Sequence, residues 1–241
     1  AALDGLVASF VARAGFTGPD DVLGGRRGFL PIMSDQFDLS SLEREPENIY
    51  AIEEVYRKPY SACRHAHPAI DAAINMRSKY NIPTDNIKRI MVHTYKSAIE
   101  GHDHTVVRDA VSAKMSIPYS VAVSLEYGRA GIEEFSTELL DDKKIASLTR
   151  KVGIYADDDL SSLVPSKRAA IVELITYDNK CFTERIEMAR GEPENPLSDD
   201  EMKEKFIYLA TYGNKSREAC QEIVHIVSNL EHQLHNLFRL L

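Results

Sequence analysis

"RAAIVELITYDNKCFTERIEMARG", residues 168–191, is the stretch that decides the fold class of this chain. Apolar and β-branched residues alternate with polar ones on both sides of Asp178-Asn179-Lys180. Alternation with a period of two is typical of strands, and turn-forming residues between two such runs are typical of a hairpin. The sequence therefore predicts a β-hairpin over residues 168–191.

Segments before the hairpin predict further strands and helices. "TDNIKRIMVHTY" (84–95) alternates in the same way, which predicts a strand with one buried face. "IYAIEEVYRKPY" (49–60) is rich in aromatic and β-branched residues and predicts a strand that runs into a loop. His67-Pro68 suits the start of a helix, and residues 102–128 are expected to be mostly helical.

Helices are expected at both ends of the chain. Apolar residues at helical spacing predict a first helix that ends at Gly15; they are Leu3, Leu6, Val7, Phe10, Val11 and Ala14. Ser198, with Glu201 three residues later, forms a capping box at the start of a helix over residues 195–213. Residues 217–241 predict one long amphipathic helix. Because no N-cap residue precedes the first helix, we expect the chain to be a piece of a longer protein.

The order of these segments predicts a multi-domain α and α+β protein. Helices at both ends bracket a mixed middle, and the simplest arrangement packs the two ends together. We therefore expect residues 1–49 and 192–241 to form an all-helical body, with residues 50–191 as an inserted α+β domain.

Composition and charge argue against several classes of protein. The 241 residues are 44% hydrophobic and 27% charged, which is ordinary for a soluble globular protein, and no apolar run approaches the roughly 20 residues of a membrane span. The net charge of −8 argues against a nucleic-acid partner, although a local cluster of cations could still bind a small anion. The 3 cysteines lie far apart and form no disulfide framework, so a reducing compartment such as the cytoplasm is expected.

The stretch "KPYSACRHAHPAIDAA" (58–73) holds the densest group of reactive side chains. A zinc site is one interpretation, because Cys63, His65 and His67 are possible ligands. No matching fourth ligand lies nearby in the sequence. The other candidate histidines fall on separate predicted elements: His93, His102 and His104. We therefore predict no metal site.

The same cluster admits a nucleophilic cysteine or an anion pocket. Cys63 lies beside Arg64 and shortly before a helix N-terminus, which favours its thiolate, and His67 is a possible base. A small, half-buried cysteine with no chemistry fits the residue type equally well. For an anion, Lys58 and Arg64 supply two cations next to the free N–H groups at the start of the helix, with His67 at the edge to transfer protons. A solvated charged loop is the alternative, and residue chemistry alone leaves these interpretations open.

Family resemblance favours the anion pocket. "KPYSACRHAHPAIDA" (58–72) resembles the Lys-Pro-Tyr…Cys-Arg…His…Ile-Asp-Ala signature of the MmgE/PrpD family. Its members include 2-methylcitrate dehydratase, cis-aconitate decarboxylase and iminodisuccinate epimerase. Further similar stretches follow in the family's order over nearly the whole chain: "GFTGP" (15–19), "LGGRRGF" (23–29), "NIKRIMVHTY" (86–95), "SAKMSIPYSVAVSLEYG" (112–128) and "NPLSDDEMKEKF" (195–206).

The resemblance implies a helical body with a smaller α+β lid domain, in agreement with the order of elements expected above. It also implies a further N-terminal helical portion, whose Asp and His face the lid residues across the active-site cleft. Nothing in this chain matches that portion. The partners implied are a di- or tricarboxylate substrate, the N-terminal portion of the same enzyme, and a second copy in a homodimer.

The resemblance also assigns roles to individual residues. Lys58 matches the active-site lysine of the family, and Cys63 falls where members place a Cys or His that handles protons. Arg64 matches an arginine of the dehydratase-like branch, and His67 matches the histidine that closes the motif. Tyr119 is a secondary candidate for substrate binding, although a core aromatic with a satisfied hydroxyl is the simpler interpretation.

These roles imply proton transfer at a carbon next to a carboxylate, without a cofactor or a metal. The expected enzyme is a hydro-lyase of the 2-methylcitrate dehydratase type, since Cys63 with Arg64 resembles the dehydratase and epimerase branches more than animal-type decarboxylases. An epimerase or decarboxylase of the same family is the alternative, and so is a fragment with no activity of its own. A hydrolase that uses Cys63 as its nucleophile is the third hypothesis.

Overall fold

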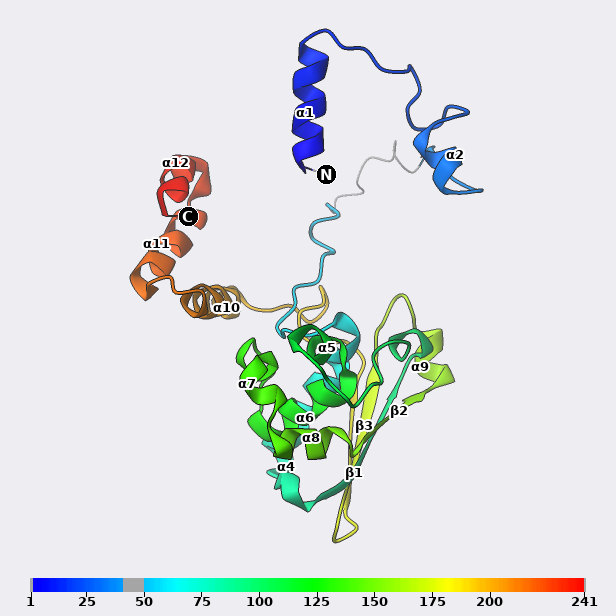
Figure 1. Cartoon of the computed structure of the whole chain (residues 1–241), viewed down its shortest axis with the longest axis vertical. Coiled ribbons are helices and arrows are strands. Elements are labelled where there is room, and N and C mark those ends of the chain that lie inside the picture. The colour runs from blue at the N-terminus through cyan, green and yellow to red at the C-terminus, as the bar shows by residue number, and fades with distance from the viewer. Residues whose placement is uncertain (1, 41–49, 241) are drawn as a thin grey trace. The chain divides into compact units, whose positions relative to one another are not determined.

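The computed structural model describes residues 2–40 and 50–240 (Figure 1). The chain divides into two compact units, residues 1–52 and residues 53–241. The first unit contains α1 (Ala2–Arg13) and α2 (Phe29–Met33). The predicted first helix is confirmed as α1. Gly15 follows its last turn with φ of +93°, a left-handed conformation that glycine adopts at little cost.

A four-stranded sheet organises the second unit. Its strands are β1 (Ile87–Thr94), β2 (Val152–Ala156), β3 (Ala170–Thr176) and β4 (Cys181–Ile186), in the spatial order β2-β1-β3-β4. The predicted hairpin is confirmed as β3 and β4, which pair antiparallel across a turn with Asn179 at φ of +59°. β1 pairs antiparallel with β3 and parallel with β2, a strand not predicted from the sequence.

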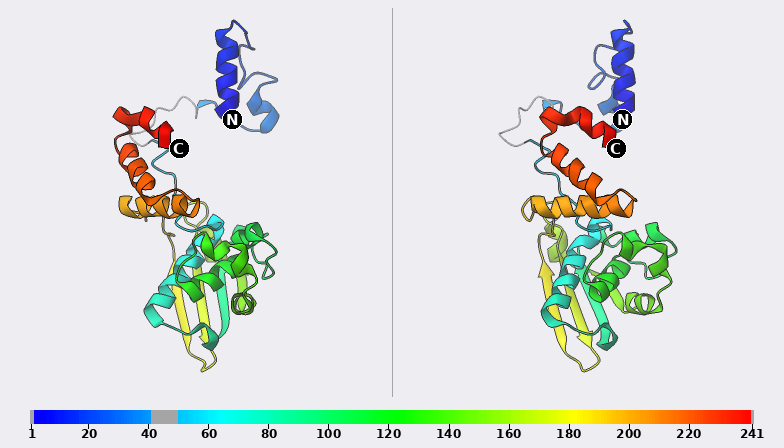
Figure 2. Two further views of the ribbon diagram at one scale, coloured as in Figure 1. Left: turned by 60° about the vertical axis from the view of Figure 1, so that its left-hand side comes forward. Right: turned by 90° about the vertical axis from the view of Figure 1, so that its left-hand side faces the viewer.

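Helices α4 (His67–Tyr80) and α6 (Ile117–Tyr127) cover one side of this sheet (Figure 2). α4 packs against β3, β4 and α6, and α6 packs against β2. Side chains along β3 alternate between buried and half-buried, so one set faces the helices, as the period of a strand requires. α4 begins at His67-Pro68, as predicted.

The single buried face predicted for β1 is confirmed, with Ile90, Val92 and Thr94 buried. Ile87 is buried as well, although strict alternation would place it on the other face. A register shift between Ile87 and Arg89 interrupts the pairing of β1 with β3. An extra residue at such a bulge reverses the face of the side chains before it.

Shorter helices connect the strands, and longer helices follow the sheet. The connecting helices are α5 (Ala110–Met115), α7 (Thr137–Leu140), α8 (Lys143–Thr149) and α9 (Asp158–Ser162), with 3-10 turns at Arg64–Ala66, Thr84–Asn86, Lys96–Ala98 and Glu133–Phe135. The helices after the sheet are α10 (Asp199–Tyr212), α11 (Arg217–Val227) and α12 (Leu230–Leu240). Ser198 caps α10 in the predicted capping box with Glu201.

The prediction of a strand over residues 49–60 is wrong for the described residues 50–60, which form turns and a loop. Residue 49 lies outside the described residues. Most aromatic and β-branched side chains of this segment are exposed. Arg57 N–H donates to the carbonyl of Gly191 at 2.7 Å, outside any ladder of strand hydrogen bonds. A strand needs a partner along its length, and neither edge strand of the sheet, β2 or β4, pairs with this segment.

The single helix expected at the C-terminal end is two helices, α11 and α12, separated at Ser228 and Asn229. The Ser228 hydroxyl donates to the carbonyl of Val224, and the Asn229 side-chain amide donates to the carbonyl of His225. Polar side chains that bond to backbone carbonyls compete with helical N–H groups, so the first helix stops there. Leu241 lies outside the described residues.

The mixed α and β class is confirmed, and the four strands lie inside the predicted middle domain of residues 50–191. That residues 1–49 and 192–241 pack together as one helical body stays a prediction, as does the role of the middle domain as an inserted lid. Among the described residues, helices that combine enough length and apolar character to span a bilayer are absent.

Substitution of Gly191 tests how closely the segment after β4 packs against the loop before α4. Its φ is +90°, and a Cβ there would lie 1.8 Å from the carbonyl oxygen of Arg57. We expect Gly191→Ala to lower the free energy of unfolding by about 2 kcal/mol or more, because a left-handed alanine is strained and the clash involves backbone. Urea denaturation measures the loss.

Gly213→Ala is the matched control. Gly213 has φ of −80°, and a Cβ there would lie 3.4 Å from the carbonyl oxygen of Ala210, which is an ordinary contact. Equal losses in the two variants would contradict the close fit at Gly191.

Candidate functional site

The loop before α4 carries the reactive side chains and is held at both of its ends. Cys63 N–H donates to the carbonyl of Lys114 at 2.8 Å. On α4, the buried Asp71 accepts hydrogen bonds from the Tyr60 hydroxyl and, at 2.7 Å, from Arg190 N–H. Asp71 therefore ties the loop and α4 to the segment after β4.

Arg64 lies buried between this loop and the segment after β4. Its Nε and Nη2 lie 3.1 and 2.5 Å from Oε1 of Glu192. Its Nη1 donates to Nδ1 of His67 at 2.8 Å and to the carbonyl of Arg190 at 3.1 Å, and the guanidinium lies 4.7 Å from the ring centre of Tyr56. Because its charge is already matched, a substrate carboxylate could reach Arg64 only by displacing Glu192.

His67 is fully buried at the start of α4, and both of its ring nitrogens have partners. Arginine can only donate, so Nδ1 accepts the bond from Arg64, and Nε2–H donates to the carbonyl of Ala62 at 3.3 Å. Burial and then the charge of Arg64 lower the pKa of His67 to about 3. The neutral ring therefore holds Arg64 in position, and a role for His67 in proton transfer stays a prediction.

Lys58 is exposed at the start of the loop, next to a cation that the sequence motif did not include. Nζ of Lys205, on α10, donates to the carbonyl of Lys58. Burial and then the charge of Lys58 lower the pKa of Lys205. Within residues 2–40 and 50–240, neither lysine forms an ion pair with a carboxylate. Only the fold brings Lys205 here, since it lies 147 residues from Lys58.

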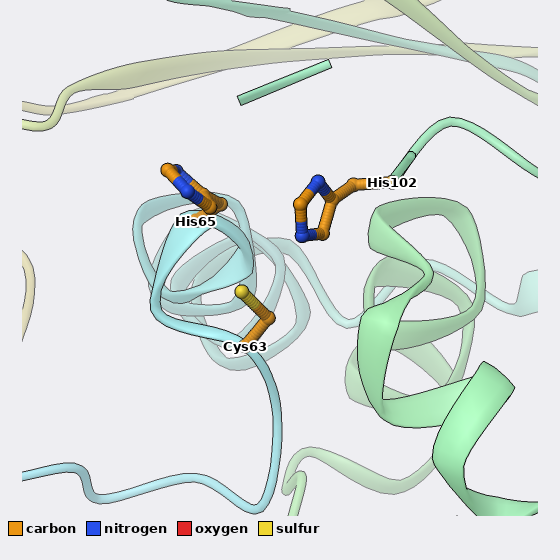
Figure 3. Close-up of side chains that lie close together, drawn as sticks. All are labelled: Cys63, His65 and His102. Carbon is orange, nitrogen blue, oxygen red and sulfur yellow. The ribbon is translucent and has the colours of Figure 1, made fainter. Parts of the chain in front are cut away.

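Cys63 lies beside His65 and His102 (Figure 3). The Cys63 Sγ and one ring nitrogen of each of these two histidines all lie within 4.8 Å of one another. The two imidazole rings are 5.0 Å apart, edge to face, and burial lowers the pKa of His65. His102 lies on a separate element, as expected, in the segment after β1, and only the fold brings it to this loop. Such a tertiary contact leaves no local pattern in the sequence.

Tyr119 lies in the hydrophobic core on α6. Its hydroxyl donates to the carbonyl of Glu134 at 2.9 Å, and its ring packs against Phe135. This position is that of a core aromatic with a satisfied hydroxyl, and a role for Tyr119 in substrate binding stays a prediction.

Comparison with known proteins gives one family match and two similar enzymes. Residues 60–230 match the family model of the MmgE/PrpD C-terminal domain. Cis-aconitate decarboxylase of Mus musculus is 24% identical over 247 residues, which cover 98% of this chain and 48% of that protein. The Homo sapiens protein of the same name is 25% identical over 239 residues, which cover 96% of this chain and 48% of that protein. The chain therefore spans about half the length of the curated relatives it matches.

Removing the charge of Glu192 tests how much the ion pair between Arg64 and Glu192 contributes to stability. We expect Glu192→Gln to lower the free energy of unfolding by about 3 kcal/mol or more, because the guanidinium is left buried without a carboxylate. Glu187→Gln is the matched control, since Glu187 pairs with Lys167 and Arg185 at the exposed surface; its loss should not exceed about 1 kcal/mol. Similar losses in urea denaturation would contradict the buried role of this pair.

The lowered pKa of His67 predicts a loss of stability in acid. The unfolded chain protonates this ring near pH 6.5, whereas the folded protein does so near pH 3, so unfolding takes up a proton between these values. Arg64, Lys58 and Lys205 all oppose a charge on the ring. The stabilisation by neutral His67 is complete above its unfolded pKa and falls by about 2 kcal/mol between pH 7 and pH 5. Urea denaturation at both pH values measures this fall, and His67→Asn should remove it; an unchanged pH dependence would refute the assignment.

Proposed function

This chain belongs to the MmgE/PrpD family, and we propose on that basis that it carries part of the active site of a cofactor-independent lyase. The substrate is a di- or tricarboxylate, and the reaction begins with proton transfer at the carbon next to a carboxylate. The main support is the pair of cations Lys58 and Lys205, which lie together at the loop before α4 without a carboxylate partner among the described residues.

Two neighbouring ammonium groups favour a bound anion. Burial and then the charge of Lys58 already lower the pKa of Lys205, and a carboxylate between the two would offset both effects. The N-terminus of α4, which has no side-chain cap, adds partial positive charge nearby. A substrate with two or three carboxylates suits this place better than a neutral one.

Arg64 binds a second carboxylate of the substrate in this proposal. Its guanidinium already holds the Glu192 carboxylate with two nitrogens, a geometry that suits any carboxylate. Because two carboxylates beside one guanidinium repel each other, Glu192 has to move aside when the substrate binds. In the free protein, the Glu192 carboxylate then occupies the position that the substrate carboxylate takes when it binds.

Cys63 moves the proton in this proposal. Breaking the C–H bond builds negative charge on the neighbouring carboxylate, and fixed donors at such a position are worth about 2.7–4 kcal/mol each. Lys58 and Lys205 supply that stabilisation, while the half-buried Cys63 thiolate accepts the proton. His67 is the alternative carrier, but it would first have to release Arg64.

Proton transfer at this carbon leads to three possible outcomes. A hydroxyl on the neighbouring carbon leaves as water, proton return on the other face gives an epimer, and a β,γ-unsaturated acid loses carbon dioxide. We favour dehydration of the 2-methylcitrate dehydratase type, which the pairing of Cys63 with Arg64 in the motif supports. Decarboxylation is the second candidate, because the similar proteins of Mus musculus and Homo sapiens carry the name cis-aconitate decarboxylase.

The opposite face of the substrate meets a further portion of the enzyme in this proposal. The aligned region covers 48% of each curated relative, and the family resemblance implies an N-terminal portion with an Asp and a His across the cleft. That portion supplies the second acid or base, and two copies form a dimer. This chain alone would then bind carboxylates without turning them over.

Deuterium incorporation tests the reaction class. A panel of di- and tricarboxylates in D₂O is followed by proton NMR with this chain and with a full-length enzyme side by side. Deuterium is expected at the carbon next to a carboxylate with the full-length enzyme alone. Exchange by the short chain would show that this half of the site suffices, and no exchange by either protein would contradict the proposal.

Variants of the lysine pair test the anion site. On the full-length enzyme, Lys58→Ala and Lys205→Ala are each expected to lower kcat/KM by about 100-fold or more, because each removes a fixed cation from the developing charge. Lys203→Ala is the matched control on the same helix, since Lys203 pairs with the exposed Asp200, and it should keep wild-type activity. Full activity in Lys58→Ala would refute the assignment.

A further inference from the structure

We propose that Cys63, His65 and His102 form a binding site for a divalent transition-metal ion, best suited to Zn²⁺. The Sγ and one nitrogen of each ring lie within 4.8 Å of one another. Figure 3 shows the three side chains close together, Cys63 and His65 from the loop before α4 and His102 from the segment after β1, with one ring nitrogen of His102 directed toward the sulfur. The sequence-based expectation of no metal rested on the missing fourth ligand and on the placement of His93, His102 and His104 on other elements; the fold brings His102 to this loop.

The surroundings of His102 fix which ring nitrogen carries the hydrogen. Nδ1 lies 2.8 Å from the carbonyl of Glu100, and a carbonyl can only accept, so Nδ1 is the donor. Nε2 of the neutral ring then carries a free lone pair. It has no hydrogen-bond partner among the described residues, and the residue is only 9% exposed. Metal-bound histidines commonly donate their other nitrogen to a carbonyl in this way.

His65 can supply a second nitrogen by the same arrangement. Its Nδ1 lies 2.6 Å from the hydroxyl of the buried Tyr95, which leaves Nε2 available when Nδ1 carries the hydrogen. The backbone on both sides of the cluster is anchored, since Cys63 N–H donates to Lys114 and Ile117 N–H donates to the carbonyl of His102, each at 2.8 Å. The ligands therefore start from fixed positions.

The geometry and the donor set suit zinc. Zinc binds thiolate at about 2.3 Å and imidazole at about 2.0–2.1 Å in a tetrahedron, which separates neighbouring ligand atoms by about 3.4–3.6 Å. The three atoms would therefore close by about 1.4 Å at most from their 4.8 Å limit, and rotation of the half-buried Cys63 side chain contributes to that movement. The described cluster holds no carboxylate, so Mg²⁺ and Ca²⁺ are disfavoured. A fourth position stays open to water or another ligand.

Neighbouring cations oppose the bound ion. Lys58 and Arg168 both lie close enough to His65 to act on its charge. The Cys63 thiolate offsets one of the two positive charges of the ion, and the ion produces that thiolate by displacing the thiol proton to solvent. A stable complex therefore depends on the cysteine as well as on the two imidazoles.

Cobalt binding tests the site without reference to turnover. The chain is freed of metal with a chelator and titrated with Co²⁺. We expect one equivalent to bind with the near-ultraviolet charge-transfer absorption of a cobalt–thiolate bond, and added Zn²⁺ to abolish that absorption by displacing the cobalt. Cys63→Ser should lose the absorption, and His102→Gln should weaken binding by about tenfold or more.

Two matched controls lie far from the cluster in sequence. Cys181 is exposed on β4 and His225 is exposed on α11, so Cys181→Ser and His225→Gln should bind cobalt like the wild type. Circular dichroism shows whether Cys63→Ser keeps its fold, and His65→Gln repeats the test at another ligand. Absence of the absorption in the wild type, or its persistence in Cys63→Ser, would overturn the proposal and leave the proposed lyase function untouched.

Discussion

The buried guanidinium of Arg64 is the constraint on which the candidate site depends. An unpaired charge in a protein interior costs several kcal/mol, so Arg64 can lie there only while Glu192, His67 and the carbonyl of Arg190 surround it. These partners come from the start of α4 and from the segment after β4. The positions of the loop, of α4 and of the end of the hairpin are therefore set together, and Asp71 reinforces the same junction.

Two kinds of cation result around this junction. Arg64 is matched by Glu192 and has to release it before it can bind a ligand, whereas Lys58 and Lys205 lack a carboxylate partner among the described residues. The Cys63 thiol has two proposed uses that exclude each other, since a thiolate bound to a metal ion cannot accept a proton from a substrate. The supply of metal would therefore decide which form of the site is populated.

Local patterns predicted the elements whose structure is decided locally. The β3–β4 hairpin, the start of α4 and the Ser198 capping box each depend on residues a few positions apart. Tertiary contacts decided the rest. β2 forms because it pairs in parallel with β1. The segment of residues 50–60 has a strand-like composition but does not pair with an edge of the sheet. For the site, the motif placed its reactive residues in one loop. The motif could not show that Glu192 pairs with the guanidinium of Arg64. Nor could it show that Lys205 and His102 reach this loop from distant segments.

The order of the strands also bears on how the chain folds. β3 and β4 are neighbours in sequence, so their pairing closes a short loop at little entropic cost. β2 joins β1 in parallel only after a connection that includes α5, α6, α7 and α8, and pairing across such a long connection is intrinsically slow. β1 pairs with β3 across a connection that is longer still, because it contains β2. The hairpin is therefore expected to form first and β1 to join it late. Arg64 and its carboxylate on Glu192 lie 128 residues apart in the chain. Their ion pair therefore belongs to the contacts that form late, after the hairpin has brought Glu192 into place.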